Sequence, residues 1–349
     1  MIESIEFTNF KALRKTTVPL APFTLLLGPN GSGKTSVLQA LQCIASIAAG
    51  QVGIDRTTDA QLRMSWTSLL SVTAENRSAV VEIKLRFRLN KKLFAAKYEW
   101  LPNGQSPWQL SYQDGGTIQA PDAASALNWL GRMQTYALDS YAIAQPIPVN
   151  SGPLHQSGFG LAAVLDDLKD NHPERWELLL AEMERWLPEY DYIQFDKPQQ
   201  GQKGIVLRTK KGGHRIPASQ LSQGTLLGLA LLTLAYLPSP PSVVGLEEID
   251  RSLHPRLLRH LQDALYRLSY PESCGEKRLP IQVIATTHSP YLLDMYREHP
   301  EEVVLARKEG LEVEMKRLTD IEHYEEILGD SPLSEVWYSG VLGGVSVKP

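Results

Sequence analysis

The sequence predicts an α/β protein in which a mixed central sheet is flanked by helices and accompanied by an antiparallel β region. Apolar strands expected at 21–28 and 242–246 are each followed by helical periodicity, and a third apolar strand is expected at 281–287. Residues 80–89 instead alternate between apolar and charged side chains, which indicates a half-exposed antiparallel strand. The length of 349 residues fits one large α/β domain or two interlocked lobes.

The remaining elements follow from the same kinds of pattern. Further strands are expected at 1–10, 92–101 and 108–115, in a hairpin turning at Gly212 and Gly213, and as a pair within 301–318. Helices are expected at 34–49, 122–138, 158–170, 173–187, 225–237 and 255–269.

Charge and composition narrow the choice of function. The net charge is −4 and the pI about 6.1, so no overall positive field attracts nucleic acid, and such contact needs a local patch or a partner. The two cysteines, Cys43 and Cys274, lie outside any metal-ligand spacing. The N-terminus lacks a signal-peptide pattern, and the longest apolar stretch, 226–237, is too short to span a bilayer. We therefore expect a cytoplasmic protein without a membrane segment.

The segment 28–35 carries the strongest single motif. Its sequence, GPNGSGKT, matches the phosphate-binding loop G-x-x-x-x-G-K-[S/T], and it lies between an expected buried strand and an amphipathic helix. Glycines let backbone N–H groups curl around an anion, and the helix start adds its dipole. Lys34 is expected to bridge the β- and γ-phosphates of a nucleoside triphosphate, and the Thr35 hydroxyl to ligate Mg²⁺. The expected nucleotide-binding residues of the loop are Asn30, Gly31, Ser32, Gly33, Lys34, Thr35 and Ser36.

Polar residues also gather where the other two apolar strands end. Glu247 and Glu248 end the second strand, with Asp250 just beyond, and His288 follows the third strand. In a parallel α/β sheet, residues at the carboxyl ends of strands face the ligand crevice. These side chains are therefore expected beside the phosphate loop.

A second glycine-containing segment, LSQG at 221–224, directly precedes the apolar helix expected at 225–237. Ser222 and the open backbone N–H groups around Gly224 form an anion site at a helix N-terminus. An ordinary helix N-cap is the alternative interpretation of the same residues.

Together, and in this order, the segments resemble the heads of ABC-type ATPases. The resemblance is closest to the RecF/SMC-like branch, which includes soluble AAA family ATPases of the OLD and bacterial defence type, and it covers about residues 1–320. Residues 221–224 resemble the ABC signature, Glu247 and Glu248 the end of Walker B, Asp250 the D-loop, His288 the switch histidine, and Asn9, Phe10 and Lys11 the N-F-K opening.

The resemblance implies a P-loop NTPase fold, built as a single two-lobed ABC-type head. Lobe I would span about 1–120 with the phosphate loop and the antiparallel sheet, followed by a helical region at about 121–200. Lobe II, about 201–349, would hold the signature, Walker B and the switch histidine. The interval between the phosphate loop and the signature shows no coiled-coil arm, and the residues after 318 are too few for the nuclease domain of OLD-type proteins. We therefore expect a stand-alone head.

The resemblance also implies an ATPase that uses ATP and Mg²⁺. Lys34, Glu248 and His288 would be its catalytic residues, with Glu248 as the general base. Thr35 and Glu247 would ligate Mg²⁺. Glu247 stands where the family usually has Asp, and its extra methylene shifts the metal geometry, so slow hydrolysis is expected.

In such heads the signature of one subunit caps the γ-phosphate held by the phosphate loop of another. The resemblance thus implies a homodimer around ATP, in which Ser222, Gln223 and Gly224 contact the partner's nucleotide. Lys11 would lie near the phosphates, and Gln145 is the candidate Q-loop residue. A stand-alone head would act on a separate effector, for example a nuclease in antiviral defence or DNA repair.

Other interpretations stay open at this point. His288 can be a histidine hydrogen-bonded in a loop, and His254 is expected to help start the helix that follows it. Some basic residues of the Gly212 hairpin form either a solvated surface or a nucleic-acid contact: Arg208, Lys210, Lys211, His214 and Arg215. The whole chain can also be the ATPase subunit of an ABC transporter, or a sensor that binds ATP without turnover.

Overall fold

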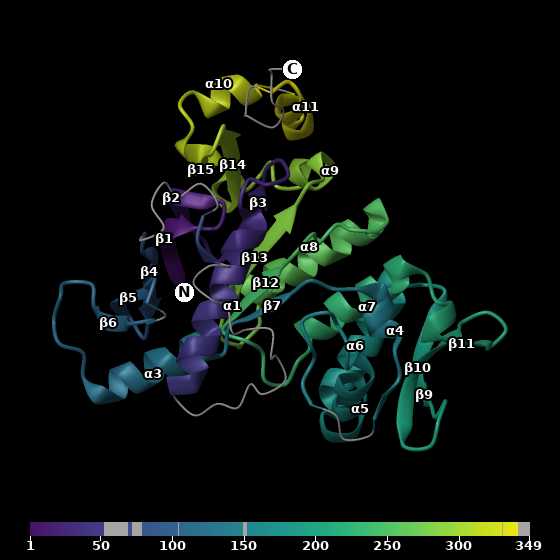
Figure 1. Cartoon of the computed structure of the whole chain (residues 1–349). Coiled ribbons are helices and arrows are strands. Elements are labelled where there is room, and N and C mark those ends of the chain that lie inside the picture. The colour runs from purple at the N-terminus through teal and green to yellow at the C-terminus, as the bar shows by residue number, and fades with distance from the viewer. Residues whose placement is uncertain (52–68, 72–78, 104, 149–151, 330, 341–349) are drawn as a thin grey trace. The chain divides into compact units, whose positions relative to one another are not determined.

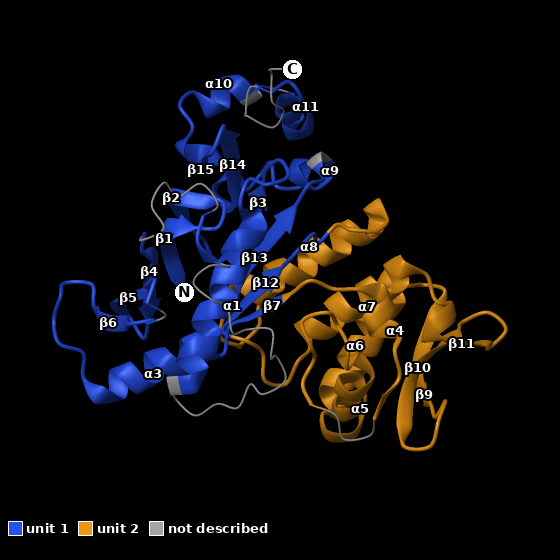
Figure 2. Ribbon diagram, in the orientation of Figure 1, with its two compact units in different colours: residues 1–135, 242–249, 282–349 blue, residues 136–241, 250–281 orange. Residues whose placement is uncertain are grey.

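The computed structural model describes residues 1–51, 69–71, 79–103, 105–148, 152–329 and 331–340. Their contacts divide the chain into two compact units (Figure 2). Unit 1 contains residues 1–135, 242–249 and 282–349, and unit 2 contains residues 136–241 and 250–281.

A six-stranded mixed sheet has the order β15-β14-β3-β13-β12-β7 (Figure 1). Its strands are β3 (Phe23–Leu27), β7 (Gln134–Tyr136), β12 (Val243–Leu246), β13 (Gln282–Thr287), β14 (Val303–Glu309) and β15 (Glu312–Arg317). Strands β14, β3, β13 and β12 pair in parallel, and β15 runs antiparallel to β14. Every residue of β3, β12 and β13 is buried, as their largely apolar sequences predict.

Unit 1 also contains a five-stranded antiparallel sheet of order β2-β1-β4-β5-β6. Its strands are β1 (Ile2–Phe10), β2 (Leu13–Pro19), β4 (Val81–Leu89), β5 (Lys92–Trp100) and β6 (Trp108–Tyr112). In β4 the apolar residues are buried or half-buried and every other residue is charged, so the predicted half-exposed antiparallel strand is confirmed. Strand β2 was not expected from the sequence.

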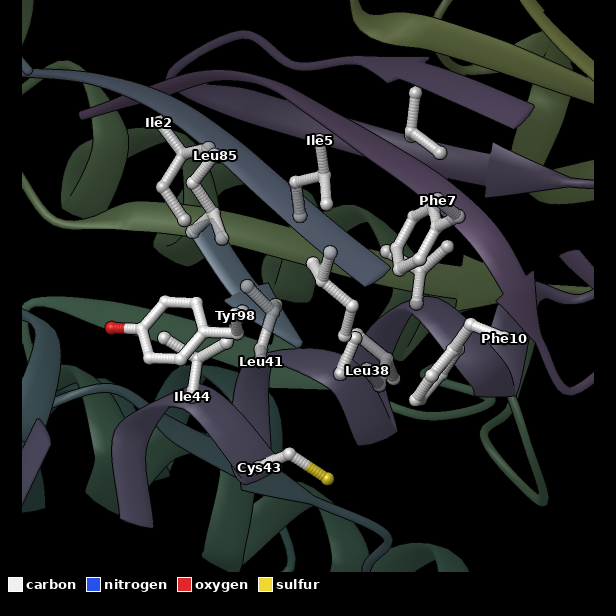
Figure 3. Packing of buried hydrophobic residues seen from close by; sticks show 14 of the residues in the cluster. Ile2, Ile5, Phe7, Phe10, Leu38, Leu41, Cys43, Ile44, Leu85 and Tyr98 are labelled. Carbon is white, nitrogen blue, oxygen red and sulfur yellow. The ribbon is translucent and has the colours of Figure 1, made fainter. Parts of the chain in front are cut away.

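Helix α1 (Lys34–Gln51) and the antiparallel sheet share one hydrophobic core. Helix α1 contributes Leu38, Leu41 and Ile44 to this core. They lie together with Ile5 of β1 and Leu85 of β4 (Figure 3). The helix that begins in the phosphate loop is thus anchored by its apolar face, which fixes where its first turn lies.

Gln282, the first residue of β13, links the two sheets of unit 1. Its Oε1 accepts from the Ile2 N–H at 2.7 Å, while its Nε2 donates to the carbonyls of Ile2 at 2.8 Å and Ala21 at 2.9 Å. The side chain is only 4% exposed, so these hydrogen bonds satisfy backbone groups that water cannot reach. One polar residue therefore sets the position of β1 against the central sheet.

Unit 2 is a group of helices with a small sheet. Its helices are α4 (Ser140–Ala144), α5 (Leu161–Asn171), α6 (Pro173–Trp186), α7 (Gln223–Ala235) and α8 (Pro255–Ser269). Its strands are β8 (Ile147–Pro148), β9 (Tyr190–Asp196), β10 (Gln202–Thr209) and β11 (Arg215–Pro217), and the predicted hairpin is the antiparallel pair of β10 and β11. Residues 225–234 of α7 are all buried, which explains why its sequence is apolar on every side.

The helix expected at 122–138 is wrong in its second half. Helix α3 (Ala120–Gly131) ends early, and the next residues form β7 beside β12. Ser242 holds this end, because its hydroxyl donates to the Trp129 carbonyl at 2.6 Å and its N–H to the Arg132 carbonyl at 3.2 Å. A strand paired with residues far along the chain leaves no local periodicity to detect.

The remaining helices are α9 (Pro290–Asp294), α10 (Tyr324–Leu328) and α11 (Leu333–Tyr338). The strand pair expected within 301–318 is confirmed as β14 and β15. Within the described residues, no helix has both the length and the apolar character needed to cross a membrane.

Candidate functional site

The phosphate loop, residues 28–35, lies between β3 and α1, at the carboxyl end of the central parallel strands. Gly31 and Gly33 have φ of 73° and 83°, a left-handed conformation that favours glycine. A Cβ on Gly33 would lie 2.4 Å from Leu13 Cδ2, and a Cβ on Gly28 would lie 2.6 Å from the Ala306 carbonyl oxygen. Glycine is therefore required here both by backbone angle and by close packing, and the curled loop fits an anion.

Lys34 directs its ammonium back into this loop. The residue is 5% exposed, and its Nζ donates to the carbonyls of Gly28 at 2.6 Å and Pro29 at 3.0 Å. Burial lowers the pKa of Lys34 to about 8, although the carboxylates of Glu248 and Glu247 act in the opposite direction. A buried cation enclosed by backbone groups suits a strongly anionic phosphate chain.

Thr35 and Glu247 bring two side-chain oxygen atoms together. The Thr35 hydroxyl, in the first turn of α1, donates to Glu247 Oε1 at 2.5 Å, just beyond the end of β12. Among the described residues, no group of three or more His, Cys, Asp or Glu side chains forms a metal cage. Mg²⁺ prefers one or two protein oxygens with phosphate and water completing its shell, so this pair fits the expected metal.

Glu248 is held in a strained backbone conformation beside that pair. Its φ is 47°, its N–H donates to Thr286 Oγ1 at 2.9 Å, and the next N–H, of Ile249, donates to the Thr286 carbonyl at 3.1 Å. A left-handed non-glycine residue costs on the order of 1–3 kcal/mol and persists only where its surroundings impose it. Thr286 imposes it here, through side chain and backbone together.

His288 follows β13 and lies near the same carboxylate, with its Nε2 3.9 Å from Glu248 Oε1. The structure therefore brings Lys34, Thr35, Glu247, Glu248 and His288 to adjoining strand ends of unit 1, as the sequence predicts.

The segment 221–224 begins α7, as expected. Ser222 is the N-cap, and its Oγ accepts from the Thr225 N–H at 3.1 Å. Gln223 Oε1 accepts from the Ser252 hydroxyl at 3.2 Å, and a Cβ on Gly224 would lie 2.7 Å from the Ser252 carbonyl oxygen. The N-cap interpretation is therefore confirmed, and Ser222 and Gln223 are both exposed.

Other residues of the loop differ in exposure. Ser32 and Ser36 are buried, and Ser32 Oγ lies 3.5 Å from Lys34 Nζ. Asn30 and Gly31 are exposed at the tip. The loop thus has a packed base and an open tip.

Lys11, which is expected near the phosphates, contacts helix α1 in the structure. Its Nζ donates to Gln39 Oε1 of α1 at 2.7 Å, and burial lowers its pKa. Among the described residues, no hydrogen bond or ion pair joins Lys11 to the phosphate loop, so its expected place near the phosphates stays a prediction.

The remaining candidates lie in unit 2. Gln145 ends α4 and its Nε2 donates to the Tyr141 carbonyl at 3.3 Å. The Asp250 carbonyl accepts from the Leu253 N–H at 3.2 Å. His254 caps α8 by accepting from the Arg256 N–H, so its expected part in starting that helix is confirmed.

Two family models of ATPase domains match separate stretches of the chain. A family model described as an AAA ATPase domain matches residues 1–99, and one described as an AAA domain, putative AbiEii toxin, Type IV TA system, matches residues 135–294. A 44-residue stretch is 39% identical to an OLD nuclease of Thermus scotoductus. That stretch is 13% of this chain and 8% of the relative's length.

Solved structures show the same fold at low sequence identity. An SMC head bound to the C-winged helix domain of ScpA matches with a TM-score of 0.59 and 15% identity, over 90% of this chain and 96% of that chain. The SMC head domain from Thermotoga maritima matches with a TM-score of 0.50 and 15% identity, over 92% and 99%.

The fold and the phosphate loop define a P-loop protein with an AAA/ABC-like ATPase fold. More narrowly, the chain has the fold of the SMC heads, which it matches over 90% and 92% of its length.

Packing of the loop is tested by comparing two glycines with similar backbone angles. Gly33→Ala and Gly213→Ala both place a Cβ at positive φ, but only Gly33 meets a neighbour, Leu13. We expect Gly33→Ala to lower the free energy of unfolding by about 1–3 kcal/mol more than Gly213→Ala, measured by urea denaturation. Equal losses for the two variants would contradict the close packing.

Proposed function

We propose that this protein binds and slowly hydrolyses ATP, dimerises around ATP, and thereby switches a separate effector. The observation that carries the proposal is the convergence of Lys34, the Thr35–Glu247 pair and Glu248 on one loop edge. An enclosed ammonium, two adjacent metal-ligand oxygens and a nearby carboxylate are the parts that phosphoryl transfer needs.

Each residue has a role that its position supports. Bound Mg²⁺ neutralises charge on the phosphate oxygens. Thr35 and Glu247 would hold it, and Lys34 would exchange its carbonyl partners for phosphate oxygens. Glu248 would orient the attacking water and accept its proton. His288 lies near the Glu248 carboxylate, on the same side of the site. Hydrolysis is expected to be slow because Glu247, and not Asp, would hold the metal.

Dimerisation is proposed from the start of α7. Ser222 and Gln223 are exposed at the helix N-terminus, where backbone N–H groups and the helix dipole favour an anion. We infer that this end caps the γ-phosphate held by the phosphate loop of a second copy. ATP then joins two chains, and its hydrolysis releases them.

The effector is proposed to be a separate protein. A nuclease of a defence or repair system is one example of such an effector. Support comes from the relatives: one is an OLD nuclease, and one SMC head is bound to a domain of ScpA. A nucleic-acid contact through the β10–β11 hairpin has less support, because Arg208 pairs with Asp191 at 2.8 Å and Lys210 with Glu184 at 3.6 Å.

A sensor that binds ATP without turnover is the second candidate, favoured by Glu247 at the metal position. Glu248→Gln separates the two functions. It should keep ATP binding while lowering kcat by about 10²–10⁴-fold in a phosphate-release assay, because the water loses its base. ATP should then hold this variant as a dimer in size-exclusion chromatography with light scattering.

The control for this change is Glu322→Gln, which alters an exposed carboxylate of unit 1 outside the site. It should leave kcat and the oligomeric state unchanged. A wild-type protein with no phosphate release above that of Glu248→Gln would favour the sensor, and Glu248→Gln that stays monomeric with ATP would contradict the dimer.

Sharing of the site between chains is tested by mixing two inactive variants. Lys34→Ala removes the cation of the loop, and Ser222→Arg places bulk and positive charge at the capping helix. In a heterodimer, the intact loop of the Ser222→Arg chain meets the intact 221–224 segment of the Lys34→Ala chain. One composite site is whole, so ATPase activity should return to below half of the wild-type rate.

Two controls accompany the mixture. Ser222 caps α7, so the melting temperature and ATP binding of Ser222→Arg are measured first. Lys34→Ala is then mixed with the double variant Lys34→Ala/Ser222→Arg, a pair that has no whole site and should stay inactive. The absence of recovery in the first mixture, with heterodimers demonstrated by differential tags, would mean that the site is not shared.

A further inference from the structure

Strand β14 continues past the end of β3 and runs alongside the phosphate loop. The parallel register pairs Val303 with Leu25 and Leu305 with Leu27, the last residue of β3. Ala306 then follows beside Gly28, because its carbonyl oxygen would lie 2.6 Å from a Cβ on that glycine. The last residues of β14 therefore form one wall of the loop.

The register between β14 and β15 shows which side chains of β14 lie on the face that meets the loop. Ala306 pairs with Met315 and Lys308 with Val313, so these side chains share one face. Met315 reaches the loop, since its Cε would lie 3.6 Å from a Cβ on Gly33. Lys308 reaches it too, because its Nζ would lie 3.4 Å from a Cβ on Gly31, at the open tip.

The side chain of Lys308 has no hydrogen bond or ion pair with any described residue, although acidic side chains are close by in sequence. Those acids have other partners: Glu314 pairs with Lys316 at 2.5 Å, and Glu312 pairs with Arg14 at 3.3 Å. Lys308 is exposed, so its ammonium is hydrated and its long side chain can turn.

We propose that Lys308 is a second phosphate-binding lysine of this site, contacting the phosphate chain of the nucleoside triphosphate from the tip of the loop. The inference rests on the proposed function and extends it. Lys34 lies inside the curl and is already engaged with the loop's own carbonyls, whereas Lys308 approaches from the strand beyond it. A compact, mobile ammonium is well suited to follow a phosphate group. No motif marks this lysine in the sequence.

The test compares two lysines of the same hairpin. Lys308→Met removes the charge that faces the loop, and Lys316→Met removes an equal charge from the opposite face, where it pairs with Glu314. Equilibrium binding of a fluorescent ATP analogue is measured for both, for wild type and for Lys308→Arg. For Lys308→Met we expect a Kd about 5–20-fold higher than that of wild type, and a Kd that depends less on salt concentration. For Lys316→Met and Lys308→Arg we expect Kd values near that of wild type.

Melting temperature without nucleotide gives the check on folding, and it should not change for Lys308→Met because the side chain is exposed. Equal Kd values for Lys308→Met and Lys316→Met would overturn the inference while leaving the proposed function intact. The proposed function itself fails in a different way, through absence of ATP binding by the wild-type protein.

Discussion

The close packing of the glycine loop against its neighbours is the constraint on which the rest of the site depends. Leu13 and Ala306 lie so near that a Cβ on Gly33 or Gly28 would clash with them, and the loop curls around the Lys34 ammonium. That curl buries the ammonium and lowers its pKa. The cost of a buried cation is offset by the backbone carbonyls that accept from it, and a phosphate chain can take over the same role.

Because β3, β13 and β12 pair in parallel, the residues of the candidate site lie together at the carboxyl ends of these strands. Each strand ends in a residue with a distinct part: the loop after β3, Glu247 and Glu248 after β12, and His288 after β13. Thr286 of β13 adds the hydrogen bonds that hold Glu248 in its strained conformation. The proposed metal ligand, the proposed base and the phosphate loop are thus positioned by neighbouring strands of one sheet, which is a more rigid support than separate loops.

The sequence predicts those parts of this arrangement that depend on residues close together in the chain. The loop, its strand and its helix are recognisable because glycines, an apolar run and helical periodicity follow one another within 23–51. What it does not predict depends on residues that meet across the sheet. The end of α3 and strand β7 are set by Ser242 and β12, the clamp on Glu248 by Thr286, and the approach of Lys308 by the register of β14. None of these has a periodic or motif signature.

We propose that the loop around Lys34 binds the phosphates of ATP. The most direct measurement is equilibrium binding of labelled ATP in the presence of Mg²⁺, for wild type and for Lys34→Ala. We expect micromolar binding by wild type and its loss in Lys34→Ala, because the β- and γ-phosphate charge is left uncompensated in a buried loop. Micromolar binding retained by Lys34→Ala, with the fold intact by circular dichroism, would contradict it.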